Sequence, residues 1–133
     1  MDGMRRGLTL LELIVMTIVV GILVAIGIPT YRATIERQYC RQSQDLLLAV
    51  YTAERVRQAD TGSYLALGPG DNWRTLGLDN PNGAGSPVSF QVDTASCAPA
   101  PCFLATTTYQ GDLLLTINQD RTLSSPSGRC PVS

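Results

Sequence analysis

The sequence contains neither histidine nor lysine. Without histidine, the chain cannot form a His-ligated metal centre or a catalytic Ser-His or Cys-His pair. Its acidic residues are scattered, and no glycine-rich stretch has the spacing of a phosphate-binding loop. We therefore expect no enzymatic activity, no cofactor and no metal site.

Positive charge is scarce in the second half of the chain. From residue 60 onward there are six aspartates and three arginines, a formal net charge of 3 − 6 = −3. Negative charge repels the phosphate backbone, so we predict no nucleic-acid partner. The 133 residues suffice for one modest domain with an extension, and not for two independent cores.

Four cysteines are present, and none is part of a C-x-x-C pair of the kind that binds zinc. Disulfides are therefore expected, and these indicate a compartment outside the cytosol. Three pairings are formally open. Cys97 and Cys102 flank a short loop with two prolines, which favours a bridge between them and leaves Cys40 to pair with Cys130.

A long apolar run begins at Leu8 and continues to Pro29. Its length, about 20 residues, matches a bilayer-spanning helix. Arg5 and Arg6 precede it, which places the N-terminus in the cytoplasm and the remainder outside. The run is too long for an ordinary secretory signal, and no A-x-A-like cleavage site follows it. One interpretation is a single-pass signal anchor.

Glu12 is the exception to the apolar character of this run. A carboxylate in hydrocarbon costs roughly 2.5–3.5 kcal/mol even on lenient insertion scales. An acid near a helix N-terminus is stabilised by the helix dipole. That effect does not explain the depth of Glu12 in an apolar segment.

Gly7 followed by Leu-Thr-Leu-Leu-Glu resembles the class III signal of type IV pilins and the related pseudopilins. In that family a membrane-embedded prepilin peptidase cuts after the glycine of a short basic leader, and the new N-terminus is methylated. The resemblance implies cleavage between Gly7 and Leu8, methylation of Leu8, and a mature chain of 133 − 7 = 126 residues. The family usually has phenylalanine where this chain has Leu8. The match is close over the first 30 residues.

The resemblance also implies a role for Glu12, which falls on the fifth mature position. In the family, a glutamate there pairs with the N-terminal amino group of a neighbouring subunit and sets the register of assembly. Such a pair removes much of the penalty of a lone charge in lipid. On a helix from Leu8 onward, the amine of Leu8 and the carboxylate of Glu12 would also lie one turn apart.

Helix is predicted from Leu8 to Gln58. Pro29 is expected to interrupt or kink it, and Gly21 to loosen it, because proline removes a hydrogen bond and glycine weakens a helix interior. This resembles the segment that unwinds in pilin filaments, and an ordinary proline kink is the alternative. Residues 31–59 form its amphipathic half. The stripe comprises Ile35, Tyr39, Leu46, Leu47, Val50, Tyr51 and Ala53.

Residues 60–87 are rich in Gly, Pro, Asn and Asp and predict a long irregular connection, pinned by Trp73, Leu76 and Leu78. Its acids lack the spacing of a calcium loop, so turn chemistry is the better explanation. The remaining residues are strand-like. The expected strands are Val88–Val92 with alternating burial, residues 103–109, residues 113–118 after a Gln-Gly-Asp turn, and residues 121–124 as a fourth strand.

The predicted fold class is α+β, a pilin fold with a long N-terminal helix on a three- to four-stranded antiparallel sheet. Its expected parts are a leader (1–7), a transmembrane and filament-core helix (8–30), an amphipathic helix (31–59), an αβ-loop (60–87) and a sheet head with the disulfides (88–133). The resemblance implies a filament subunit that resides in the inner membrane and then in an extracellular pilus. Its partners would be other copies, prepilin peptidase, the inner-membrane assembly machinery and lipid. A type II secretion pseudopilin and a monomeric membrane-anchored binding module are the alternatives.

Overall fold

The computed structural model describes residues 7–132. Residues 1–6 of the predicted leader, which include Arg5 and Arg6, lie outside the described residues. The chain divides into two compact units, residues 1–36 and residues 37–133, here called the N-terminal and C-terminal units.

One helix, α1 (Leu10–Thr61), is continuous through Gly21 and Pro29. The expected interruption at Pro29 is therefore not observed in this chain. Proline removes one backbone hydrogen bond, and a helix can carry that loss without breaking. At the next residue, the Thr30 hydroxyl donates to the carbonyl of Ile26 at 3.1 Å. Unwinding within a filament stays a prediction.

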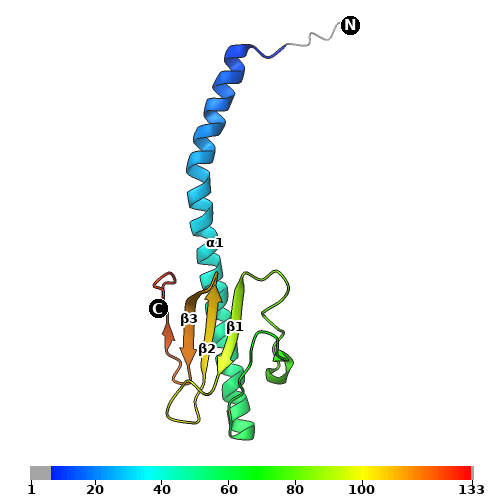
Figure 1. Ribbon diagram of the computed structural model, residues 1–133, viewed down its shortest axis with the longest axis vertical. Coiled ribbons are helices and arrows are strands. Elements are labelled where there is room, and N and C mark those ends of the chain that lie inside the picture. Colours follow the sequence, from blue (N-terminus) through cyan, green and yellow to red (C-terminus); the bar gives the residue numbers. More distant parts are fainter. Residues whose placement is uncertain (1–6, 133) are drawn as a thin grey trace. The chain divides into compact units, whose positions relative to one another are not determined.

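Four antiparallel strands form one sheet in the order β1 (Val88–Asp93), β2 (Leu104–Tyr109), β3 (Asp112–Asn118) and β4 (Leu123–Ser124). They lie against the C-terminal half of α1 (Figure 1). Strands β2 and β3 are joined by Gln110 and Gly111, whose φ angles are +53° and +87°. Two successive positive φ values make the hairpin turn that matches strand twist. The predicted α+β fold, a long helix packed on a four-stranded antiparallel sheet, is confirmed.

The face of α1 that covers the sheet follows spacings of three and four residues, as a helix packed on one side requires. Its buried residues are Cys40, Ser43, Leu47, Val50 and Glu54. Leu47 and Val50 of the predicted stripe are buried on this face, and Tyr39, Leu46 and Tyr51 are half-buried and pack against the core. The sequence did not predict that the polar residues Ser43 and Glu54 are buried with them.

A row of buried side chains runs across the sheet. It joins Phe90, Thr107 and Leu115, which occupy paired positions on β1, β2 and β3. Aromatic rings connect the sheet to the helix and to the loop that follows it, with Tyr51 and Tyr64 both within 6.2 Å of the Phe103 ring, centroid to centroid. Such pairs add to the stability that burial alone provides.

The connection after α1 is anchored where the sequence predicts. Trp73 begins a short 3-10 helix, η1 (Trp73–Leu76), and its side chain is buried. Its indole N–H donates to the carbonyl of Gly68 at 3.0 Å, so burial leaves this donor satisfied. Leu76 and Leu78 are half-buried and pack against the core. The predicted pinning of the loop by these residues is confirmed.

The same loop closes the outer edge of β1. Leu67 exchanges two backbone hydrogen bonds with Val92, at 2.9 and 2.7 Å. The side-chain amide of Asn82 does the same with the backbone of Phe90, at 3.0 and 2.6 Å. The Ser86 hydroxyl donates to the carbonyl of Val88 at 2.9 Å. An edge paired in this way cannot accept a strand from another molecule.

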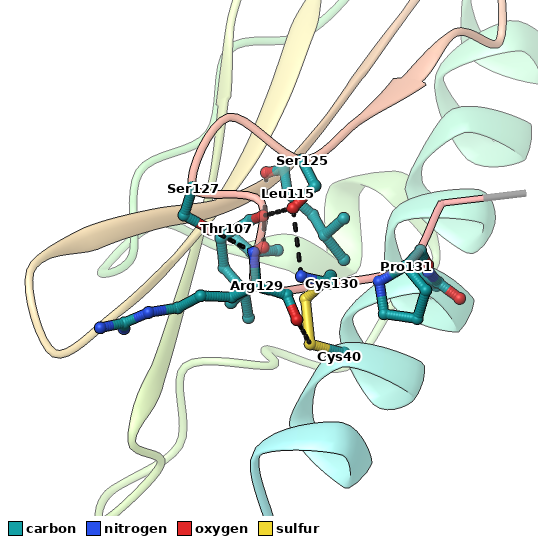
Figure 2. Close-up of a disulfide and its surroundings, with 10 residues drawn as sticks. Cys40, Thr107, Leu115, Ser125, Ser127, Arg129, Cys130 and Pro131 are labelled. Carbon is teal, nitrogen blue, oxygen red and sulfur yellow. Dashed lines mark hydrogen bonds between the residues drawn. A yellow bond between two sulfur atoms is a disulfide. The ribbon is translucent and has the colours of Figure 1, made fainter. Parts of the chain in front are cut away.

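The two predicted disulfides are formed in the C-terminal unit. Cys97 pairs with Cys102, and Cys40 on the helix pairs with Cys130 near the C-terminus. Figure 2 shows the second bridge between α1 and the tail. The side-chain amide of Gln44 also holds this tail, donating to the carbonyl of Pro131 at 2.6 Å.

The two disulfides should differ in their contribution to stability. Cys40–Cys130 closes a separation of 90 residues and Cys97–Cys102 a separation of 5. Replacing the first pair by alanine should lower the free energy of unfolding by about 4–5 kcal/mol, and replacing the second by about 2 kcal/mol, because loop-closure entropy grows with loop length. Denaturant titrations followed by Trp73 fluorescence measure both. Equal losses in the two double variants would contradict the argument.

Glu54 is fully buried on the sheet-facing side of α1. One carboxylate oxygen accepts a hydrogen bond from the Leu65 backbone N–H at 2.9 Å, and the other has no partner among the described residues. Burial raises the pKa of the Glu54 carboxyl, and the Leu65 hydrogen bond and the charge of Arg57 oppose this shift without cancelling it. The carboxyl group thus ties the loop to the helix at an electrostatic cost.

The folded chain holds the proton of Glu54 more tightly than the unfolded chain does. The free energy of unfolding should therefore fall as pH rises from the ordinary pKa of glutamate through the raised one. Glu54→Gln keeps an acceptor for Leu65 but cannot ionise, so it should remove this part of the pH dependence. Denaturant unfolding of both proteins between about pH 4 and pH 8 tests this. Parallel stability profiles would show that Glu54 is not the group responsible.

Candidate functional site

The first turn of α1 is capped by Thr9. Its carbonyl accepts the Leu13 N–H at 3.1 Å, and its hydroxyl accepts the Glu12 N–H at 3.3 Å. A threonine three residues before a glutamate is the arrangement of a capping box. Glu12 thus lies in the first helical turn, where the helix dipole favours a negative charge.

Leu8 lies outside the helix, because Thr9 ends the helical hydrogen bonding on that side. The prediction that α1 begins at Leu8 is therefore wrong by two residues. Leu8 and Glu12 are therefore not one helical turn apart on α1, contrary to the expectation for a helix that begins at Leu8. Gly7 and Leu8 are both exposed and non-helical, and a β-carbon added at Gly7 would meet nothing within 4 Å.

The carboxylate of Glu12 forms no ion pair or hydrogen bond with any described residue. Other polar side chains of the apolar run do: the Thr17 hydroxyl donates to the Ile14 carbonyl at 2.8 Å, and Thr30 bonds to its own helix in the same way. Threonines satisfied by backbone are compatible with a lipid environment. The carboxylate is the polar group in this run that still requires a partner.

The apolar side chains around Glu12 are exposed throughout the N-terminal unit. Leu10, near one end of the run, is 78% exposed and Ile28, near the other, is 52% exposed. Within residues 7–132, α1 is the one helix long and apolar enough to cross a membrane, and its most apolar 18 residues have a mean hydropathy of 2.7. None of its most apolar stretch is buried within the chain, unlike the core helix of a soluble protein. A signal sequence would pass the same test.

Gly21 and Gly27 lie in the same run without any close contact. A β-carbon added at either position would meet no atom within 4 Å. The fold of the chain itself therefore does not need glycine at these positions, and each weakens the helix by about 1 kcal/mol relative to alanine. Any need for glycine must come from what surrounds the helix.

The structure thus brings Gly7, Leu8 and Glu12 together at the start of α1. It places the cysteines elsewhere, in the C-terminal unit, where they secure the fold. Sequence reasoning missed the cap at Thr9, although the Thr-x-x-Glu pattern marks it. It also missed the burial of Ser43 and Glu54. The only sequence signal for their burial was their spacing of three or four residues from Cys40, Leu47 and Val50, which lie on the same helix face.

No protein-family model, no curated protein and no solved structure matches the chain. An inference about its function therefore rests on the residues of the N-terminal unit. These are an exposed Gly7, a helix start capped by Thr9, and a Glu12 carboxylate that has no partner among the described residues in an apolar surface.

Proposed function

We propose that the chain is a structural subunit of a type IV pilus-like filament, and that it polymerises through its N-terminal helix after removal of residues 1–7. The observation that carries this proposal is the carboxylate of Glu12, exposed and without a partner among residues 7–132, at the start of a helix whose apolar side chains are exposed. Lipid alone could cover the apolar side chains. Lipid hydrocarbon could not satisfy the carboxylate.

A cation is required to compensate the Glu12 charge once the helix is surrounded by apolar groups. Cleavage after Gly7 creates one, because it frees the α-amino group of Leu8. Since Leu8 lies outside the helix, its own amine is not held one helical turn from Glu12. The amine of a neighbouring copy can meet the carboxylate instead, which makes the ion pair a device for assembly.

Polymerisation by strand addition is disfavoured by the C-terminal unit. Leu67, Asn82 and Ser86 pair with the outer edge of β1. At the opposite edge, β4 covers part of β3, and the Ser125 hydroxyl bonds to the Leu114 carbonyl at 3.2 Å. The β1 edge is thus paired, and the opposite edge is formed by a strand of two residues, which is too short to be a good template for strand addition. The large apolar surface left for contact between copies is that of α1.

In this proposal the subunit is held in the inner membrane by α1 until it joins the filament. The C-terminal unit then lies outside the cytosol, where its two disulfides are stable. The partners are prepilin peptidase, the inner-membrane assembly machinery and other copies of the chain.

Processing provides one test. Gly7→Val should block cleavage, because a branched side chain cannot enter a peptidase pocket shaped for glycine, and it should leave the fold intact because nothing contacts Gly7. Intact mass spectrometry should find the 126-residue chain (133 − 7) in wild type and the uncut chain in the variant. Equal masses in the two strains would refute cleavage at this position.

Assembly provides the second test. Removing one partner of a buried ion pair costs about 3–5 kcal/mol, so Glu12→Val, which leaves the Leu8 amine without its counter-charge, should abolish filaments. Glu12→Asp keeps the charge but shortens its reach by one methylene, so it should give an intermediate filament yield. Insertion into the membrane should be at least as efficient as in wild type, because the variant removes a charge from the apolar segment. Immunoblots of sheared filaments and of membranes measure the two quantities.

Thr17→Val is the matched control, because it removes a hydroxyl from the same apolar run that bonds only to its own helix. It should leave the filament yield unchanged. Normal filaments in the Glu12→Val strain would refute the pairing of Glu12 with the Leu8 amine. A wild-type strain without filaments of this chain would favour a simple membrane anchor.

A further inference from the structure

An open hollow of about 610 Å³ lies in the C-terminal unit, between α1 and the C-terminal tail. Its helix side is made by Arg37, Cys40, Arg41 and Gln44, and its tail side by residues 128–132. Three of the lining residues are arginines and none is an acid. The volume is within the range of small-molecule sites in proteins.

Arg37 and Arg41 are the charged groups on the helix side of this hollow. They are four residues apart on α1 and both are exposed, so their side chains are neighbours on one accessible face. Neither guanidinium forms a hydrogen bond or an ion pair with a described residue, and Asp45, one turn beyond Arg41, does not pair with it. Like charges at this spacing repel each other. The pair therefore lacks a counter-charge within the described part of the chain.

Arg129, on the tail side, differs because it has a counter-charge of its own. Its guanidinium is 3.1 Å from the carboxylate of Asp112. Figure 2 shows its side chain directed away from the bridge between Cys40 and Cys130. The charge that remains to be compensated in the hollow is thus that of the two arginines of α1.

The tail side is held in place without a ligand. Cys130 is bonded to Cys40, and its backbone N–H donates to the Ser125 hydroxyl at 3.2 Å. The Gln44 amide donates to the Pro131 carbonyl at 2.6 Å. A wall fixed by such bonds loses little freedom when a ligand binds, which favours affinity.

Two neighbouring guanidinium groups suit an anion with more than two free oxygens. Each guanidinium presents its N–H groups as a planar fork that can pair with two oxygens at once. A carboxylate has two oxygens and one charge, whereas a phosphate monoester has three free oxygens and a charge of about −1.5 to −2 at pH 7. A phosphate monoester can therefore contact both arginines and neutralise both charges.

We propose that Arg37 and Arg41 bind the phosphate group of a monoester in this hollow. Because both side chains are exposed, water and salt screen the attraction, so the affinity is modest and falls with ionic strength. Soluble phosphate esters and phosphatidate in a membrane carry the same group. The inference concerns the C-terminal unit and does not depend on the proposed filament.

The test is an NMR titration of the full-length ¹⁵N-labelled chain in a maltoside detergent, which carries no phosphate. The probes are glycerol 3-phosphate and inorganic phosphate, with acetate and glycerol as counterparts at matched ionic strength. The two phosphates should shift the amide signals of Arg41 and of residues 128–130 in a saturable way, with a Kd of about 1 mM at low salt. Acetate should bind at least about threefold more weakly, because it can engage only one of the two arginines fully.

Arg37→Gln and Arg41→Gln should each weaken the affinity for glycerol 3-phosphate about three- to fivefold, the effect of losing one exposed ion pair. The fold should persist, because neither guanidinium has a partner in the described part of the chain and glutamine has a helix propensity similar to that of arginine. Arg74→Gln is the matched control. It removes the same charge from η1, which does not line the hollow, and should leave the affinity unchanged.

Nanodiscs distinguish the two sources of the phosphate group. Spectra are compared between discs of phosphatidylcholine and discs that also contain phosphatidate. Shifts of Arg41 and of residues 128–130 caused by phosphatidate would support the site and identify a lipid headgroup as its ligand. Shifts that require glycerol 3-phosphate in both kinds of disc would support it and identify a soluble ester.

Three results would overturn the proposal. The first is the absence of saturable shifts with glycerol 3-phosphate, inorganic phosphate and phosphatidate. The second is an affinity that Arg37→Gln and Arg41→Gln lower no more than Arg74→Gln does. The third is acetate binding as tightly as the phosphates, which would assign the arginines to a carboxylate instead.

Discussion

The carboxylate of Glu12 is the constraint on which the proposed biology of this chain depends. It lies in the first turn of a helix whose apolar side chains have no cover from the chain itself. The cap at Thr9 and the helix dipole fix the backbone around it and reduce its cost. Neither provides a counter-charge, and no other residue in the described part of the chain pairs with the carboxylate. In an apolar environment that charge would need a cation to compensate it.

The two units of the chain solve the problem of burial in opposite ways. The C-terminal unit closes upon itself: its core is covered by α1, its loop pairs with the edge of β1, and two disulfides secure the loop and the tail. The N-terminal unit satisfies only its backbone and its threonines. The C-terminal unit thus buries its own apolar side chains, whereas the large apolar side chains of the N-terminal unit stay exposed.

Much of the fold could be predicted because local chemistry and tertiary structure agree. The alternation of Val88, Phe90 and Val92 marks a half-buried strand, and Gln-Gly between two β-prone runs gives the hairpin. The buried face of α1 could be predicted only in part, because hydrophobicity does not indicate that the polar residues Ser43 and Glu54 are buried. Their burial follows from helix geometry and the sheet opposite, and Glu54 also holds the following loop through the Leu65 N–H.

The start of the helix shows a similar limit. The apolar run extends to Leu8, so hydrophobicity alone places the helix start there, whereas the hydrogen bonds of Thr9 set the first helical residue at Leu10. This shift of two residues places Leu8 outside the helix. Under the proposed function it therefore favours the amine of a neighbouring copy as the partner of Glu12.

The most direct test of the central claim is a cryo-electron microscopy reconstruction of filaments formed by the processed chain. The account predicts a filament core built from residues 8–30. In it, a carboxylate oxygen of each Glu12 should lie about 2.7–2.9 Å from the amino nitrogen of Leu8 in a neighbouring subunit, the length of a charge-assisted hydrogen bond. A filament whose contacts run through the C-terminal units, with Glu12 facing solvent, would contradict it.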